Sequence, residues 1–406
     1  MGLRAWSAPA KLGRIAYIER DGLWVRQLPD GVPQRLVNAG KMKSPKFSPS
    51  GDWIACYRDD VLHVVRIDGS GWQRLVETEQ GSQAPGFQWC ASGDRLLVGV
   101  ESGLELFTAA EGWRRSARKL AGAELPVVFS PDGTEMVYGD AVTVGRGPGG
   151  EDMRNGRLCR ISLEKGSRPV VLSSDYLAGK VPCLWTRRGD FVLYWEDPDF
   201  SGSAMSDGLE LFRIPAGGGT AQSLHVSTLV HQNMFSLGRK LAISTGGGRF
   251  EWQEKRIAVI DPEGSDLSYL TDGSMAAVCP AWSPDGAAVA YSAAPGPTDP
   301  IGVSGGDEAR ELLSKRRIFV NGTRLTNDSR YRDEEPMWSA DGSRLLFCRI
   351  AEDDSKTLWL MKADGSEAAR VAGPLYLDPG PLGVDDSWFG YYGYIEWHDM
   401  FDWFRG

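Results

Sequence analysis

A short pattern recurs along the chain. It consists of an aromatic residue, serine or a substitute, a turn often spelled Pro-Asp-Gly, and an apolar run. Eight copies align on the residue after the aromatic, at intervals of 40 to 56 residues. A repeat of this period restricts the chain to architectures in which similar small units pack on their neighbours. The units begin near residues 5, 45, 86, 127, 183, 233, 280 and 336.

Each unit predicts the same four antiparallel strands. The first strand ends in the aromatic residue, and proline and Asp-Gly then form a tight turn. An apolar second strand follows, and then a third, as at 61–67 and 209–214. A second glycine turn leads to a short fourth strand. The sequence therefore predicts an all-β protein, a single eight-bladed β-propeller of four-stranded antiparallel blades, with seven blades as the alternative.

The expected organisation is a propeller over 1–373 and an aromatic C-terminal tail over 374–406. The first unit has only a minimal inner strand, at Leu3 to Ser7, so the tail could supply a strand there and close the ring. Four apolar residues of the tail are spaced i, i+3, i+4 and i+7, which predicts a helix with one apolar stripe. Such a stripe would pack on the propeller or dock to a partner protein. These residues are Trp397, Met400, Phe401 and Phe404.

Composition excludes several kinds of partner. The 45 Lys and Arg residues against 54 Asp and Glu give a net charge of −9, so neither nucleic acid nor a membrane is expected. The six cysteines form no C-x-x-C pair and lie mostly in apolar runs, which indicates small buried side chains in a reducing compartment. No secretory signal and no apolar stretch of 18 residues is apparent. We therefore expect a cytoplasmic protein.

Motifs for cofactors and metals fail on their context. Gly145, Gly147 and Gly150 spell G-x-G-x-x-G, but the expected loop around them does not open a helix that could bind a pyrophosphate. No cluster of His, Cys and carboxylates has the spacing of metal ligands. We therefore expect no cofactor and no metal.

The segments FSPDG at 129–133, WSPDG at 282–286 and WSADG at 338–342, with the apolar strand after each, resemble the TolB-type, WD-repeat-like β-propeller family. The resemblance extends to about residue 373. It implies a binding platform, as in the partner-binding part of TolB, or a gating propeller ahead of a prolyl-oligopeptidase-type hydrolase domain. Only 33 residues follow residue 373, which are too few for such a domain.

Long loops indicate the expected binding face. The loops at 139–156, 196–208, 245–255 and 292–315 belong to blades four to seven, and long loops on a rigid scaffold commonly carry function. We expect a non-catalytic scaffold that binds a protein or peptide there, with a small ligand in the channel as a further option. The candidate binding residues on these loops, the blade connections and the tail are Arg146, Glu151, Arg154, Asp199, Phe200, Arg249, Trp252, Tyr331, Arg332, Trp397 and Phe401.

An enzyme is the alternative, a lyase, hydrolase or cyclase with its site at the mouth of the central channel. Its candidate acid–base residues are Glu196, His231 and Glu335. No acid–base pair can be identified from the sequence around them, which favours a non-catalytic role.

Overall fold

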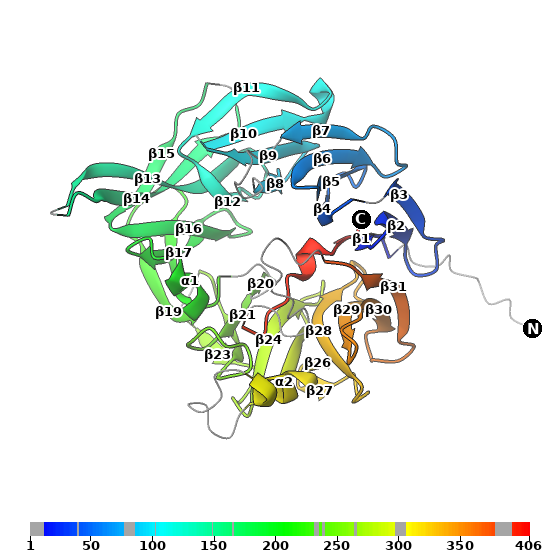
Figure 1. The fold of residues 1–406 in the computed structure, drawn as a ribbon. Helices are drawn as coiled ribbons and strands as arrows, with labels where there is room; N and C mark the ends of the chain where they lie inside the picture. The colour runs from blue at the N-terminus through cyan, green and yellow to red at the C-terminus, as the bar shows by residue number, and fades with distance from the viewer. Residues whose placement is uncertain are drawn as a thin grey trace, which may run out of the picture.

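The computed structural model describes residues 12–406 except 39, 77–85, 102, 148, 165, 231–234, 238–239, 264–265, 297–305 and 378–391. Antiparallel sheets follow one another around a central space, and the C-terminal segment crosses its middle (Figure 1). Within the described residues, no helix has the length and apolar character needed to span a membrane. The expected strand Leu3 to Ser7 lies outside the described residues.

The first half of the chain forms four four-stranded sheets, one of which includes a strand from the C-terminus. The first contains β1 (Arg14–Glu19), β2 (Gly22–Gln27), β3 (Gln34–Asn38) and β32 (Phe401–Phe404). The second contains β4 (Met42–Phe47), β5 (Trp53–Arg58), β6 (Val61–Arg66) and β7 (Gln73–Val76). The third contains β8 (Phe87–Trp89), β9 (Arg95–Val100), β10 (Gly103–Thr108) and β11 (Arg114–Ala121). The fourth contains β12 (Glu124–Phe129), β13 (Glu135–Arg146), β14 (Asp152–Ser162) and β15 (Val170–Tyr176).

The second half forms one eight-stranded and two four-stranded sheets. The larger one contains β16 (Ala178–Trp185), β17 (Phe191–Pro198), β18 (Leu209–Pro215), β19 (Gln222–Thr228), β20 (Phe235–Leu237), β21 (Leu241–Thr245), β22 (Arg256–Ile260) and β23 (Leu267–Tyr269). The next contains β24 (Met275–Trp282), β25 (Val289–Pro295), β26 (Arg317–Val320) and β27 (Thr323–Arg324). The last contains β28 (Tyr331–Trp338), β29 (Arg344–Ala351), β30 (Lys356–Lys362) and β31 (Ala369–Leu375). The helices are α1 (Ser203–Asp207), α2 (Gly306–Ser314), and the 3₁₀ turns η1 (Ala109–Glu111) and η3 (Trp397–Asp399).

The recurring turn is held by its own serine and aspartate. The Ser130 hydroxyl donates to Asp132 at 2.6 Å and accepts the backbone N–H of Glu135 at 2.9 Å. Gly133 has a φ of +68°, which favours glycine. The same two bonds, with the same lengths, form at Ser283 and Ser339. The repeated sequence therefore folds as a repeated local structure, and its aspartates are turn formers.

Alternation along the strands builds the core between neighbouring sheets. In β5, Ile54 and Cys56 pack in a cluster with the first sheet, whereas Trp53, Ala55 and Tyr57 pack with the third. Successive side chains of a strand point to opposite faces, so each sheet serves two interfaces. All six cysteines are free and five are buried.

Two expected loops are strands instead. Most of 139–156 belongs to the long hairpin of β13 and β14, because their cross-strand pairing continues from Glu135 to Arg146. The charged connection expected at 330–335 lies largely in β28, which begins at Tyr331. Charge and glycine content suggested loops, but ladder pairing with the neighbouring strand determines both segments.

Candidate functional site

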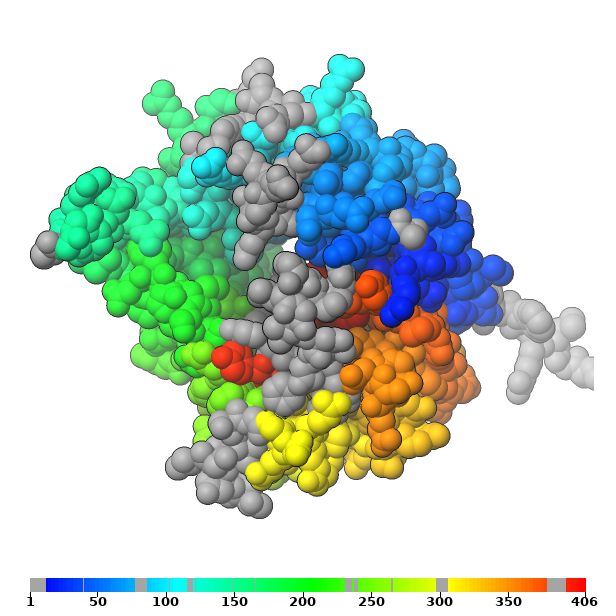
Figure 2. Space-filling model, in the orientation of Figure 1, coloured from blue at the N-terminus to red at the C-terminus, as the bar shows by residue number. Residues whose placement is uncertain are grey.

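A cavity of about 770 Å³ lies among innermost strands. Its wall is formed by β4, β8, β12 and β16, together with Trp195, Met205, Val230 and Asp402. Apart from Lys46, Gln88 and Asp402, the lining residues are apolar or glycine. Figure 2 shows a narrow opening near the centre of one face, beside the blue strands. A predominantly apolar wall and a volume of this size are typical of ligand-binding pockets.

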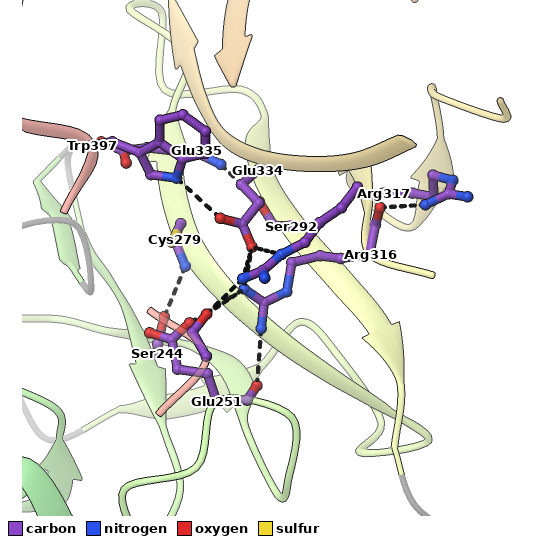
Figure 3. Close-up of polar contacts among 11 residues, drawn as sticks. Ser244, Glu251, Cys279, Ser292, Arg316, Arg317, Glu334, Glu335 and Trp397 are labelled. Carbon is purple, nitrogen blue, oxygen red and sulfur yellow. Dashed lines mark hydrogen bonds and ion pairs between the residues drawn. The ribbon is translucent and has the colours of Figure 1, made fainter. Parts of the chain in front are cut away.

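Three inner-strand residues have a left-handed backbone, namely Ser44 (φ +54°), Cys279 (φ +56°) and Glu335 (φ +49°). Each directly precedes a proline and lies where the register with the second strand shifts. Such a conformation costs a non-glycine residue about 1–3 kcal/mol, so the surroundings must hold it. The N–H groups of Cys279 and Glu335 donate to the hydroxyls of Ser244 and Ser292 on the preceding sheets, at 3.2 and 3.0 Å. These bonds fix the bulges and join adjacent sheets (Figure 3).

The tail enters the centre of the molecule and pairs with the first sheet. β32 runs antiparallel to β1, with Tyr17 opposite Phe401 and Arg14 opposite Phe404. The helix predicted over this segment is therefore wrong, because residues 397–399 form a 3₁₀ turn and residues 401–404 form a strand. The spacing of the aromatic residues fits a helix, but pairing with β1 decides the conformation.

Glu334 is the centre of a buried ionic cluster that holds the tail. Its Oε1 accepts Nη1 of Arg316 at 2.5 Å and Nε of Arg332 at 2.6 Å. Its Oε2 accepts the indole N–H of Trp397 at 3.0 Å (Figure 3). Burial alone would raise the pKa of Glu334, but the two guanidinium groups outweigh burial and lower it. The cluster thus fixes an ionised carboxylate against the tail.

Glu251 also belongs to this cluster, but only one of its two carboxylate oxygens is paired there. Its Oε2 lies 3.2 Å from Nη1 of Arg316, while its Oε1 has no hydrogen-bond partner among the described residues. Burial raises the pKa of Glu251 to about 7, although Arg316 opposes the shift. Arg316 and Arg332 also donate to the carbonyl of Gly393, at 3.3 and 2.7 Å. The charges of this cluster are therefore neutralised by one another and by the tail backbone.

A second cavity, of about 250 Å³, is bordered by β20, β24, β28 and the tail. In its wall, Nε2 of His398 lies 3.2 Å from Oε1 of Glu335. Burial lowers the pKa of His398 to about 3, and Lys46 acts in the same direction, so the imidazole is neutral near pH 7. The described part of the chain contains no group of three or more His, Cys, Asp or Glu that could hold a metal.

Segments that connect strands at one end of neighbouring sheets contact one another, and we call the surface formed by the described residues of 146–154, 199–208, 249–255 and 306–314 the loop face. The Arg154 guanidinium lies 4.1 Å over the ring of Phe200. Nε of Arg249 donates to Asp207 at 2.7 Å. Two of the predicted binding residues, Arg154 and Phe200, are thereby brought together from different sheets.

The remaining candidate binding residues at or near the surface have other surroundings. The Arg146 side chain is 78% exposed and lies 3.6 Å from Asp152. Glu151 and Asp199 are exposed, and Asp199 has a left-handed backbone with a φ of +56°. Tyr331 lies between two guanidinium groups, those of Arg330 and Arg349, at 5.3 and 4.6 Å from its ring centre.

Four of the candidate binding residues are buried. This corrects the expectation that Trp252 and Arg332 lie at the surface, whereas packing of the tail on the propeller was one of the two roles expected for Trp397 and Phe401. Trp252 is fully buried, and it packs in the cluster that contains Ala309 of α2. Arg332 is only 1% exposed because it pairs with Glu334. Trp397 and Phe401 are each 1% exposed, because the tail lies inside the molecule.

The two candidate acid–base residues that the structure describes, Glu196 and Glu335, have separate partners. Glu196 pairs with the buried amine of Lys180, which also binds Asp175 at 2.6 Å. Glu335 is buried and lies against His398. His231 lies outside the described residues. Their roles stay predictions.

The sequence did not predict the site residues that are close in the structure but far apart in the chain. Lys46 and Asp402 line the same cavity although they are far apart in the sequence, and no local pattern connects them. Arg316 belongs to none of the motifs of the sequence analysis, and its contact with Glu334 of β28 depends on how separate parts of the chain are arranged. The only available signal was the alternation of charged and aromatic residues in FDWF at 401–404.

Part of the chain is similar in sequence to a known protein. The chain is 32% identical over 98 residues to the Tol-Pal system protein TolB of Roseobacter denitrificans. The match covers 23% of this chain and 22% of that relative, so the chain spans less than a quarter of it. No protein-family model matches the chain.

Two solved structures share the fold. Prolyl oligopeptidase B from Galerina marginata has a TM-score of 0.54 at 8% identity, over 82% of this chain and 51% of that one. A candidate dipeptidyl aminopeptidase IV from Bacteroides ovatus has a TM-score of 0.52 at 10% identity, over 89% of this chain and 59% of that one. The chain thus spans about half the length of these proteins, and the likeness concerns the fold alone. Together with the sequence match, these findings confirm the predicted resemblance to TolB-type β-propellers.

Proposed function

We propose that the protein is an interaction module that binds a protein or peptide partner through the loop face. The observation that carries this proposal is the direct contact between segments that are far apart in the chain. Arg154 of β14 packs on Phe200, and Arg249 pairs with Asp207, so these segments form one surface with charged and aromatic groups. Arginine and aromatic side chains are enriched at the centres of protein interfaces. The Tol-Pal system protein in the comparison supports a protein partner.

We further propose an eight-bladed ring for this module. The structure describes seven sheets, and these correspond to eight blades if the eight-stranded sheet is divided between β19 and β21. Among the described residues, only Thr228 and Thr245 pair across that boundary, so β16–β19 and β20–β23 serve as two blades. β32 then completes the first blade from the C-terminus.

Paired substitutions test the binding face. Chemical cross-linking followed by affinity capture and mass spectrometry would compare wild type with R154A/F200A. The matched control is R213A/F191A. In this pair the Arg213 guanidinium of β18 lies 5.2 Å from the ring centre of Phe191, the first residue of β17. We expect the partner to be retained by the control and lost from R154A/F200A. Equal capture by both variants would reject the loop face.

We propose a cytoplasmic location on the basis of the six free cysteines, which suit a reducing compartment. Fractionation of cells that express the tagged full-length protein tests this. The tag in the soluble cytoplasmic fraction is the expected result, and recovery with an exported or membrane fraction would contradict it.

An enzyme at the centre of the molecule is the second candidate, favoured by the Glu335–His398 contact in a cavity wall. A neutral imidazole beside a carboxylate can take part in proton transfer. A substrate screen with E196Q, E335Q and H398N would support it if one substitution removes an activity found in wild type. Activity that is equal in all three variants would reject these residues as catalytic.

A further inference from the structure

The large cavity is lined by one positive and one negative residue and by a single uncharged polar one, in a wall that is otherwise apolar or glycine. Lys46 lies on β4 and Asp402 on β32, and both line the cavity. The third polar residue, Gln88, is already occupied, because its amide donates to the carbonyl of Val127 at 2.8 Å and accepts the N–H of Val127 at 3.1 Å. Polar recognition in this cavity therefore depends on Lys46 and Asp402.

The two charged residues lie close together. The N–H of Phe47, the residue next to Lys46, donates to Oδ2 of Asp402 at 2.7 Å. The carbonyl of Lys46 accepts the indole N–H of Trp89 at 3.0 Å, which fixes the backbone of β4 at this point. The backbone that carries Lys46 and the carboxylate of Asp402 are therefore held in place next to each other.

Neither charge has an ionic partner. Among the described residues, no carboxylate lies within 4.0 Å of the Lys46 amine, and no cationic group lies within 4.0 Å of the Asp402 carboxylate. Lys43, on the same strand, differs in this respect because its amine binds Asp60 at 2.7 Å. A charged group in an apolar wall is stabilised when a ligand brings the opposite charge.

The tail adds two titratable groups near Lys46. Burial raises the pKa of Glu396 to about 7, so this carboxyl is partly protonated at neutral pH. His398 is neutral, as described above. Neither residue lines the large cavity. Both groups lie within electrostatic range of Lys46, but Glu396 forms no ion pair with its amine.

We propose that this cavity binds a zwitterionic ligand with an apolar body, its carboxylate on Lys46 and its ammonium on Asp402. Apolar amino acids and short peptides of such residues carry both charges and an apolar body. The volume of about 770 Å³ is within the range of small-molecule sites, and aromatic and aliphatic side chains surround the rest of the ligand. This site is separate from the loop face and does not depend on the function proposed there.

Isothermal titration calorimetry of the full chain tests the proposal with four probes. These are the dipeptide Phe-Phe, its C-terminal amide, its N-acetyl form and free phenylalanine. Phe-Phe should bind, and removal of either charge should weaken binding by about tenfold or more, as expected for a charge-assisted hydrogen bond. The affinities of Phe-Phe and free phenylalanine show whether the cavity prefers a dipeptide or a single amino acid.

Variants assign each charge to its residue. K46M should bind Phe-Phe and its amide equally, and D402N should bind Phe-Phe and its N-acetyl form equally. K43M is the matched control on β4 and should retain the wild-type order of affinities. Thermal unfolding of each variant verifies folding, and K46M alone decides the matter if D402N is unstable. Equal binding of all dipeptide forms to wild type, no binding of any probe at millimolar concentration, or wild-type discrimination in K46M would overturn the proposal.

Discussion

The two sides of the central space are built from the same kind of inner strand but differ in content. On the side of β4, β8, β12 and β16, the strands surround a large apolar cavity. On the side of β24 and β28, the tail occupies the space, and the cavity that is left measures about 250 Å³. Charged side chains are buried there in a cluster around Glu334. We call these the open side and the filled side.

This difference shows that the repeat fixes the sheets but not the content of the centre. The serine–aspartate turn is the same at Ser130, Ser283 and Ser339, on both sides. What distinguishes the filled side is a non-repeated segment and the residues that receive it. The centre is thus where the chain departs from its own pattern, as functional sites often do.

The largest expected effect comes from breaking the ionic cluster of the filled side. E334A should lower the free energy of unfolding by about 3–5 kcal/mol, because it leaves Arg316 and Arg332 buried without their main counter-ion. Urea unfolding at pH 7 measures the loss. The control on the other sheets is E196A, which should cost about 1 kcal/mol, because Lys180 keeps Asp175. Equal losses in the two variants would remove the distinction between the sides.

A pH series sharpens the comparison at Glu251. Burial raises the pKa of Glu251 from 4.5 to about 7, so the folded protein keeps a proton that the unfolded chain has lost. This group therefore makes stability fall as pH rises from about 4.5 to about 7. E251Q cannot lose a proton, so its stability relative to wild type should rise over this range by up to about 3 kcal/mol.

Unfolding of both proteins at pH 4.5 and 7.5 measures this difference. Glu396 acts with the same sign, and His398 acts with the opposite sign between about pH 3 and 6.5. Both groups are present in wild type and E251Q. The effect of His398 cancels in the comparison, and that of Glu396 differs only by the minor part of its pKa shift that the Glu251 charge causes. A constant difference between the two proteins would show that Glu251 ionises normally in the folded state.

The repeated turns should respond equally. S130A and S283A each remove a hydroxyl that donates to an aspartate and accepts a backbone N–H, and each should cost about 1 kcal/mol. Thermal unfolding of both variants checks this. A large loss in one variant alone would mean that the turns differ in importance although they have the same geometry.

The smallest effect is expected at the loop face. F200A removes the ring beneath Arg154 at a partly exposed site, so it should cost about 0.5–1 kcal/mol. Chemical denaturation gives this value. A loss of the size expected for E334A would show that the loop face is part of the structural core and not a surface available to partners.

The sequence predicted the sheets well because their signals are local. An aromatic residue, a proline or its substitute and Asp-Gly determine a turn within a few residues, and alternation determines the strands on each side. The third strands at 61–67 and 209–214 correspond to β6 and β18. No similar local signal exists for β32, which pairs with β1 from the other end of the chain.

The site was harder to predict because its contacts join residues from distant parts of the chain. Arg154 and Phe200 were chosen from loop length, but Arg154 lies in β14; the two side chains are in contact, and their role in binding stays a prediction. Trp252 and Arg332 were wrongly expected at the surface, because burial of a polar or aromatic residue depends on partners such as Glu334 that come from other elements. The approach of Lys46 and Asp402 depends on closure between distant strands.

Hydrogen–deuterium exchange of the tail tests the central claim most directly, namely that β32 is an integral inner strand and that the tail fills one side of the centre. The amides of 401–404 that face β1 should exchange as slowly as those of 14–17, because the two strands share one ladder. Fast exchange in 401–404, with protection retained in 14–17, would contradict the claim, and with it the contrast between the open and the filled side.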